Sequence, residues 1–171
     1  ISLIILFFSS PCYSFTINLD IGHTPDFPGV ISSRGIPELI FNRLMANAIK
    51  KELQNQGYIV TTTENISLPD RIKIINEKKP DLVISIHHDS VQPKYLTYWK
   101  YENKDYLYSD KFSGFSIFVS KKNSKFSISY TFANILGKNL LENGFHPTLH
   151  HAEKIQGEGR TLLNDNLGIY R

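Results

Sequence analysis

Two histidines and one glutamate have the types and placement that a metal site requires. His23 comes directly after a strand-like run, Glu38 opens an amphipathic helix, and His87 follows another strand-like run. Two imidazoles and a carboxylate can hold a zinc ion while one coordination position stays open, as in catalytic zinc sites. An ion held in this way lowers the pKa of its water toward ~7 and polarises a carbonyl oxygen. The pattern therefore indicates metal-assisted hydrolysis of an amide.

The spacing of these three residues matches no short zinc-binding helix motif, so the residues alone leave structural roles open. His23 could cap a turn, and Glu38 could complement the dipole of its helix. His87 could be a hydrogen-bonded histidine at the end of a strand.

Strands and helices alternate in the pattern around these residues. Periodicity predicts strands at 15–21, 58–63, 81–86 and 115–120, and helices from 38 to a stop at 55–57, at 68–79 after the N-cap Ser67, and at 127–143. This order predicts an α/β fold: a single three-layer domain with a mixed, mostly parallel central sheet flanked by helices. The nearly continuous apolar run 81–86 is predicted as a central strand covered on both faces. Ligand chemistry collects at the carboxyl ends of strands, so His23 and His87 should share one edge.

Two stretches depart from this alternation. Residues 90–113 are polar and aromatic, and we expect a long excursion there; its rings, between 95 and 112, could contact substrate or pack the insertion onto its own domain. Residues 145–171 show little periodicity and are predicted to be mostly loop. His150, His151 and Glu153 form a second candidate metal cluster there, for which a loop lining the substrate groove is the preferred interpretation.

The composition is that of a folded domain. The chain has 171 residues, of which 41% are hydrophobic and 20% charged, which excludes disorder and coiled coil. The formal net charge of +3 is spread along the chain and forms no nucleic-acid-binding motif, so no nucleic-acid partner is expected.

The first residues indicate export. Residues 1–10 are apolar and uncharged, and they precede Cys12 and Ser14, small residues placed as a signal peptidase requires. We expect an N-terminally incomplete secretory signal at 1–14, a catalytic domain at 15–171, and no stable membrane insertion after cleavage. The alternatives are a buried N-terminal strand and, less favoured because Ser-Pro precedes the cysteine, a lipoprotein anchored through Cys12. Because Cys12 is the only cysteine, the mature domain would lack disulfides and thiolate catalysis, which suits a bacterial periplasm or cell surface.

Three motifs in order resemble one family. INLDIGHTP, Glu38 at the head of its helix, and DLVISIHHDS resemble the zinc-dependent N-acetylmuramoyl-L-alanine amidases of the type 3 family, exported bacterial cell-wall hydrolases. The resemblance implies Zn²⁺ bound by His23, Glu38 and His87, peptidoglycan as substrate, a protein activator as a further partner, and a helix Arg at Arg71.

Two departures from the family pattern bear on the site. His88 adjoins the proposed ligand, and because successive strand side chains point oppositely, only His87 should face the metal. The general base of the family is a Glu on a late strand; no such strand is found before Arg171, so we expect that Glu, and the completion of the sheet, beyond Arg171. The alternatives left open are another exported zinc peptidase, such as a carboxypeptidase acting on stem peptides, and an inactive peptidoglycan-binding module.

Overall fold

The computed structural model describes residues 14–155 and 159–171, which form two compact units. Unit 1 contains the described residues up to Ser90 together with Trp99–Tyr106, and unit 2 contains Val91–Tyr98 and Leu107–Arg171. The predicted secretory segment lies almost wholly outside the described residues. Within the described residues, no helix has the length and apolar character needed to cross a bilayer.

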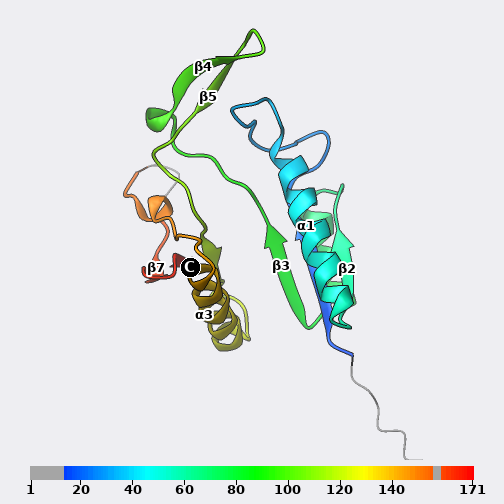
Figure 1. Ribbon diagram of the computed structural model, residues 1–171. Helices are drawn as coiled ribbons and strands as arrows, with labels where there is room; N and C mark the ends of the chain where they lie inside the picture. The colour runs from blue at the N-terminus through cyan, green and yellow to red at the C-terminus, as the bar shows by residue number, and fades with distance from the viewer. Residues whose placement is uncertain (1–13, 156–158) are drawn as a thin grey trace, which may run out of the picture. The chain divides into compact units, whose positions relative to one another are not determined.

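Unit 1 has the predicted alternation of strands and helices. Its elements are β1 (Thr16–Ile21), α1 (Glu38–Asn55), β2 (Ile59–Thr63), α2 (Leu68–Lys78) and β3 (Leu82–Ile86). The strands form a parallel sheet in the order β2-β1-β3, and α1 packs against all three (Figure 1). The α/β class is therefore confirmed, and the carboxyl ends of β1 and β3 lie side by side.

Local chemistry explains where the two helices of unit 1 begin and end. Pro37 precedes α1, where its fixed φ suits a helix start. The Ser67 side chain accepts a hydrogen bond from the Asp70 backbone N–H and caps α2, as predicted. Lys79 ends α2 in the left-handed conformation, directly before Pro80.

The middle of the unit 1 sheet is β1, and the prediction that 81–86 is a central strand covered on both faces was wrong. Five of the six β1 residues are buried, whereas β3 alternates and leaves Val83 43% exposed. The sequence did not indicate that β1 is buried, because the strand contains the polar residues Asn18 and Asp20. The side chains of Asn18 and Thr63 each donate a hydrogen bond to the other, and Asn18 donates another to Thr61. These hydrogen bonds offset the free-energy cost of burying the Asn18 amide.

The aromatic excursion contains a hairpin that the sequence pattern did not predict. Strands β4 (Thr97–Tyr101) and β5 (Lys104–Tyr108) pair after a 3₁₀ turn at Pro93–Tyr95. Glu102 and Asn103 both have positive φ, which a tight hairpin turn requires. The turn contains no glycine, so its usual signal was missing.

Unit 2 is a small mixed sheet covered by one helix. Its elements are β6 (Ile117–Phe118), α3 (Phe126–Glu142), a 3₁₀ turn at His150–Ala152, β7 (Leu162–Asn164) and β8 (Ile169–Tyr170). The sheet order is β6-β8-β7, with β6 parallel and β7 antiparallel to β8. The core holds Ala133, Leu167 and Ile169. The helix at 127–143 is confirmed, but the tail predicted to be mostly loop contributes two strands, too short to show a period.

The strands of the described residues thus form three small sheets rather than one large central sheet. The three-layer arrangement of the fold prediction is supported only within unit 1, and the assignment of 15–171 to one catalytic domain stays a prediction.

Candidate metal centre

Three elements of unit 1 bring the predicted ligands together. His23 follows β1, His87 follows β3, and Glu38 is the first residue of α1. His23 Nε2 lies 3.0 Å from Glu38 Oε2, and His87 Nδ1 lies 3.1 Å from Glu38 Oε1. One nitrogen or oxygen of each residue lies within 4.8 Å of the others, close enough to share an ion. The sequence prediction that these residues meet is confirmed; that they bind a metal is a proposal made below.

The Glu38 carboxylate is buried and held in one orientation. Its side chain is only 4% exposed. Oε1 accepts hydrogen bonds from the His88 backbone N–H at 3.0 Å and from Asn42 Nδ2 at 3.4 Å, and Oε2 accepts one from the Val30 backbone N–H at 3.4 Å. A buried carboxylate is costly unless such groups, or a cation, compensate its charge. The two histidines are more exposed, 29% for His23 and 47% for His87, so the cluster is open to solvent on their side.

Two glycines lie so close to this cluster that any side chain in their place would overlap it. A Cβ added to Gly22 would overlap the His87 ring. At Gly29, where φ is +82°, an added Cβ would lie 2.5 Å from Glu38 Oε2 and 2.8 Å from His23 Cδ2. His23 itself has a φ of 72°, rare for a residue with a side chain. The backbone around the cluster is therefore shaped to the three side chains.

His88 contacts Glu38 and Asn42, the two polar residues of α1 at the cluster. Its Nδ1 lies 2.8 Å from Asn42 Oδ1, and its ring packs against Phe41. Burial lowers the pKa of His88; the nearby Glu38 opposes this shift and His87 adds to it. In the neutral ring Nδ1–H donates to Asn42, which agrees with the prediction that only His87 faces the cluster.

A buried ion pair joins α2 to β1, and a hydrogen bond from the same carboxylate joins β1 to β3. Arg71 of α2 donates from Nη1 to Asp20 Oδ1 at 3.0 Å and to the Ile21 carbonyl at 2.9 Å. The second oxygen of Asp20 accepts from Ser85 Oγ at 2.7 Å. The network therefore holds the end of β1 against β3. Its residues Asp20 and Ser85 are paired across the two strands, close to the ends from which His23 and His87 follow. Arg71 was singled out only by its resemblance to the family pattern, and Ser85 and Asn42 were not predicted at all.

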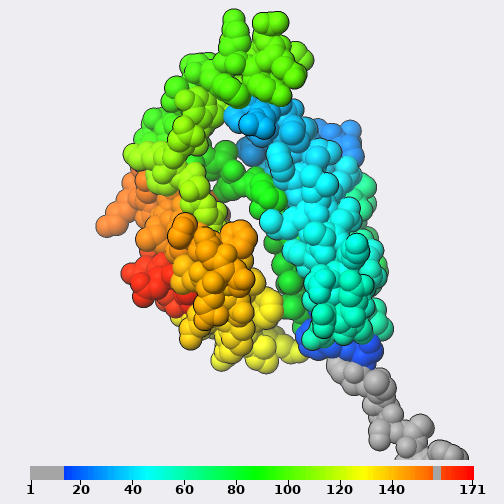
Figure 2. Space-filling model, viewed as in Figure 1, coloured from blue at the N-terminus to red at the C-terminus, as the bar shows by residue number. Residues whose placement is uncertain are grey.

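The loop at 24–36 connects the cluster to the aromatic hairpin. The loop bonds to the start of α1 through Glu38 N to Val30 O, at 2.8 Å, and Leu39 N to Pro28 O, at 3.0 Å. At its far end, Trp99 Nε1 donates to the Ser33 carbonyl at 2.7 Å. Figure 2 shows the blue loop against the green hairpin. The Trp99 ring also stacks on Tyr101, so at this point the excursion packs on its own unit.

In the second candidate cluster, which belongs to unit 2, His150 and His151 lie on a 3₁₀ turn and Glu153 directly follows it. His150 and His151 are both buried, and His150 Nδ1 lies 3.0 Å from Thr148 Oγ1. The Glu153 carboxylate instead accepts the Tyr95 hydroxyl at 2.8 Å and pairs with Lys94 at 3.7 Å. Glu153 therefore anchors the start of the aromatic stretch.

A parallel α/β sheet with a cluster of donor groups at the carboxyl ends of its strands is typical of an enzyme. The family model Amidase_3, described as N-acetylmuramoyl-L-alanine amidase, matches residues 17–161. The chain therefore belongs to this family, whose members are amide hydrolases of the peptidoglycan wall, and it is an enzyme of the N-acetylmuramoyl-L-alanine amidase class. A comparison with curated proteins gave no match.

Solved amidases share the fold at low sequence identity. The N-acetylmuramyl-L-alanine amidase Ami1 of Mycobacterium smegmatis aligns with a TM-score of 0.60 at 19% identity, over 81% of this chain and 69% of that one. The apo form of Ami1 from Mycobacterium abscessus gives 0.61 at 20% identity, over 91% and 73%. The catalytic domain of CwlV from Bacillus (Paenibacillus) polymyxa gives 0.54 at 22%, over 72% and 61%.

Proposed function

We propose that this protein is a zinc-dependent amidase that hydrolyses the bond between N-acetylmuramic acid and L-alanine in peptidoglycan. The main support for this proposal is that one donor atom from each of His23, Glu38 and His87 lies within 4.8 Å of the others. The donor set fits zinc, because two imidazole nitrogens and one carboxylate oxygen leave a coordination position free for substrate or water. The family membership supports the substrate.

The residues of the chain supply orientation and a solvent-facing opening. A bound zinc ion would lower the pKa of a water and polarise the scissile carbonyl. His23 and His87 would present their ring nitrogens from the side that solvent reaches, while Glu38 would contribute its charge from the buried side. The hydrogen bonds from Val30 and His88 hold that carboxylate in place, so little reorganisation is needed when the ion binds.

The group that moves the proton is still a prediction. A general base must take a proton from the attacking water and return it to the leaving amine. The family resemblance assigns this role to a Glu on a late strand. Export to a periplasm or cell surface, where peptidoglycan lies, belongs to the same proposal.

Zinc content tests the ligand assignment. We expect about one zinc per chain in the natural protein and at least ~100-fold weaker binding in His87→Ala, since loss of a supporting outer residue alone costs 10–100-fold. The matched control is His146→Ala, an exposed histidine of unit 2, which should keep its zinc. Full retention of one tightly bound zinc by His87→Ala would disprove the assignment.

Product analysis tests the bond. Digestion of purified peptidoglycan should release peptides with a free L-alanine amino group; release of D-alanine would indicate a carboxypeptidase instead. Binding to peptidoglycan without any product would indicate a binding module. The assay is run on this chain and on any extension of the coding sequence past Arg171.

A further inference from the structure

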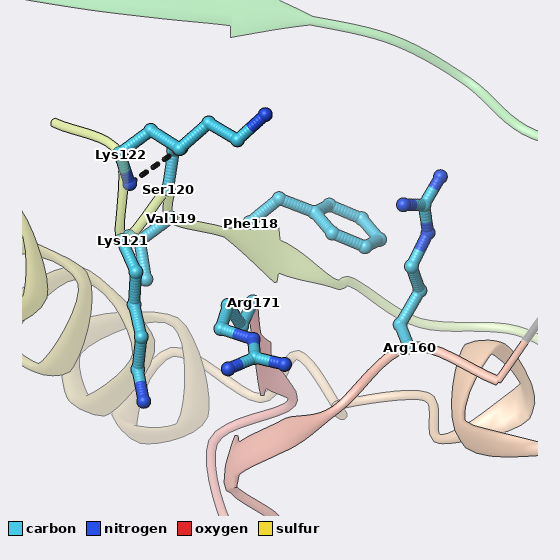
Figure 3. Close-up of a pocket in the computed structure, with 7 residues that line it drawn as sticks. All are labelled: Phe118, Val119, Ser120, Lys121, Lys122, Arg160 and Arg171. Carbon is cyan, nitrogen blue, oxygen red and sulfur yellow. Dashed lines mark hydrogen bonds between the residues drawn. The ribbon is translucent and has the colours of Figure 1, made fainter.

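Four cations line an open cavity in unit 2. The cavity has a volume of about 730 Å³ and is formed by the end of β6, the turn after it, and residues on either side of β7 and β8. Its lining is Phe118, Val119, Ser120, Lys121, Lys122, Arg160 and Arg171 (Figure 3). None of these seven lining side chains is acidic, so the charged side chains that line the cavity are all positive.

The backbone that carries these cations is fixed by hydrogen bonds. Ser120 Oγ accepts from the Lys122 N–H at 3.2 Å, which closes the turn after β6. The Arg160 N–H donates to the His151 carbonyl at 2.7 Å, and the Arg171 N–H donates to the Thr161 carbonyl at 2.9 Å. The side chains are long and exposed, but their starting points are held in place.

An aromatic platform lies among the cations. The Phe118 ring stacks on the buried Tyr170 ring, with centroids 5.2 Å apart and planes 21° apart, and it contacts His151 edge-on at 5.1 Å. The ring is nevertheless 51% exposed. In Figure 3 the side chains of Lys122 and Arg160 extend on either side of this ring, whereas Lys121 points away from it.

Among the residues that the structure describes, none of the four cations of the cavity forms an ion pair. Where the structure describes the chain, its Lys and Arg ion pairs involve Arg43, Arg71, Lys94 and Lys100, none of which lines the cavity. The Arg171 guanidinium makes one long contact, 3.4 Å, to the Thr161 hydroxyl. Cations gathered in a concave surface focus a positive potential that attracts anions. An anion bound there would also relieve their mutual repulsion.

We propose that this cavity binds the free carboxylates of peptidoglycan stem peptides, with Lys122 and Arg160 contacting the anion beside the Phe118 ring. This inference rests on the proposed function, which supplies the polymer. A guanidinium forms paired hydrogen bonds with a carboxylate, and the ring offers an apolar surface to the adjoining peptide methylenes. Phosphates share this anionic chemistry, so the experiment must separate the two sources.

Binding by the metal-free full chain tests the proposal without turnover. The probes are muropeptides with free stem carboxylates, the same muropeptides after amidation of those carboxylates, and tripolyphosphate. We expect Lys121→Gln/Lys122→Gln/Arg160→Gln to raise the dissociation constant for free muropeptides at least about tenfold, and amidation to have a similar effect on the natural chain. Added salt should weaken the interaction, because the charges are exposed.

A charge-matched variant is the control. Lys125→Gln/Lys138→Gln/Lys154→Gln removes the same number of positive charges from exposed sites of unit 2 outside the cavity and should change affinity less than about twofold. Equal losses in both variants, or unchanged affinity for amidated muropeptides, would overturn the proposal. Tripolyphosphate binding that depends on the cavity while muropeptide binding does not would also overturn it. Since the chain is metal-free, a loss of muropeptide binding is separate from a failure to form amidase products.

Discussion

Asn42 connects three parts of the candidate metal centre although it is not itself a ligand. The residue is fully buried. Its Nδ2 donates to the Gly22 carbonyl, directly before His23, and to Glu38 Oε1, while its Oδ1 faces His88 Nδ1. A single side chain therefore sets the relative positions of the proposed ligand Glu38, the strand end that precedes the proposed ligand His23, and the His88 ring.

Replacing Asn42 should weaken zinc binding more than it disturbs the helix. For Asn42→Ala we expect a ~10–100-fold loss of zinc affinity, as is usual when a supporting residue of a metal site is removed. The unsatisfied polar partners should lower the free energy of unfolding by about 1–3 kcal/mol. Chelator competition and urea unfolding measure the two effects. Asn47→Ala, an exposed position of α1, is the control, and equal zinc affinity in both variants would exclude the positioning role.

Part of this site could be predicted from single residues, and part could not. Histidines after strands and a glutamate opening a helix stand at the ends of recognisable patterns, so their meeting followed from the topology of a parallel sheet. Asn42 and Ser85 occupy ordinary positions inside elements, where nothing local shows that a polar side chain is buried. Their roles depend on tertiary contacts, such as that between Ser85 and Asp20.

At the scale of elements, the β4–β5 hairpin braces the loop that contacts the Glu38 carboxylate. Trp99 holds the loop at Ser33, and a Cβ added to Gly35 would lie 2.5 Å from the Tyr106 hydroxyl. The other end of the loop donates to Glu38 from Val30. A change in the hairpin can therefore reach the candidate metal centre through one short segment.

Trp99→Phe tests this brace. The variant keeps an aromatic ring to stack on Tyr101 but loses the indole N–H, so unfolding should become easier by about 1 kcal/mol. We expect faster amide hydrogen exchange at Val30 and easier proteolysis within 24–36. Tyr98→Phe, at an 80% exposed position of the same strand, should change neither. Unchanged exchange at Val30 in Trp99→Phe would show that the loop does not need the hairpin.

Helices were predicted well where the spacing of apolar residues and the residues at the helix ends indicate the same bounds. α1 and α2 begin and end close to their predicted bounds, because Pro37, Ser67 and Pro80 are clear signals. The central strand was misjudged because an apolar run was used as the measure of burial, although the polar groups of β1 are satisfied inside the sheet. β7 and β8 are too short to show a period, yet Ile169 and Tyr170 are fully buried.

At the scale of the whole molecule, zinc should contribute to stability by mass action. An ion that binds only the folded chain raises the free energy of unfolding by about 2.7 kcal/mol when its concentration is 100 times its dissociation constant. All three proposed ligands belong to unit 1, whose core includes Leu19, Ile21 and Leu39.

Thermal unfolding with and without zinc measures this contribution. The natural chain should unfold at a higher temperature with zinc than with a chelator, and His23→Ala should lose most of that difference. His146→Ala should keep it. A zinc-induced shift that survives in His23→Ala would place the stabilising ion elsewhere in the chain.

At His23, the residue type that suits the backbone differs from the residue type that the proposed metal site needs, because the φ angle is positive. A non-glycine residue in this region costs on the order of 1–3 kcal/mol, whereas glycine adopts it freely. His23→Gly should therefore relax the backbone while removing a proposed metal ligand. Selection for stability alone would favour that exchange. If His23 binds zinc as proposed, a screen for more stable variants should therefore select His23→Gly and lose the activity with it.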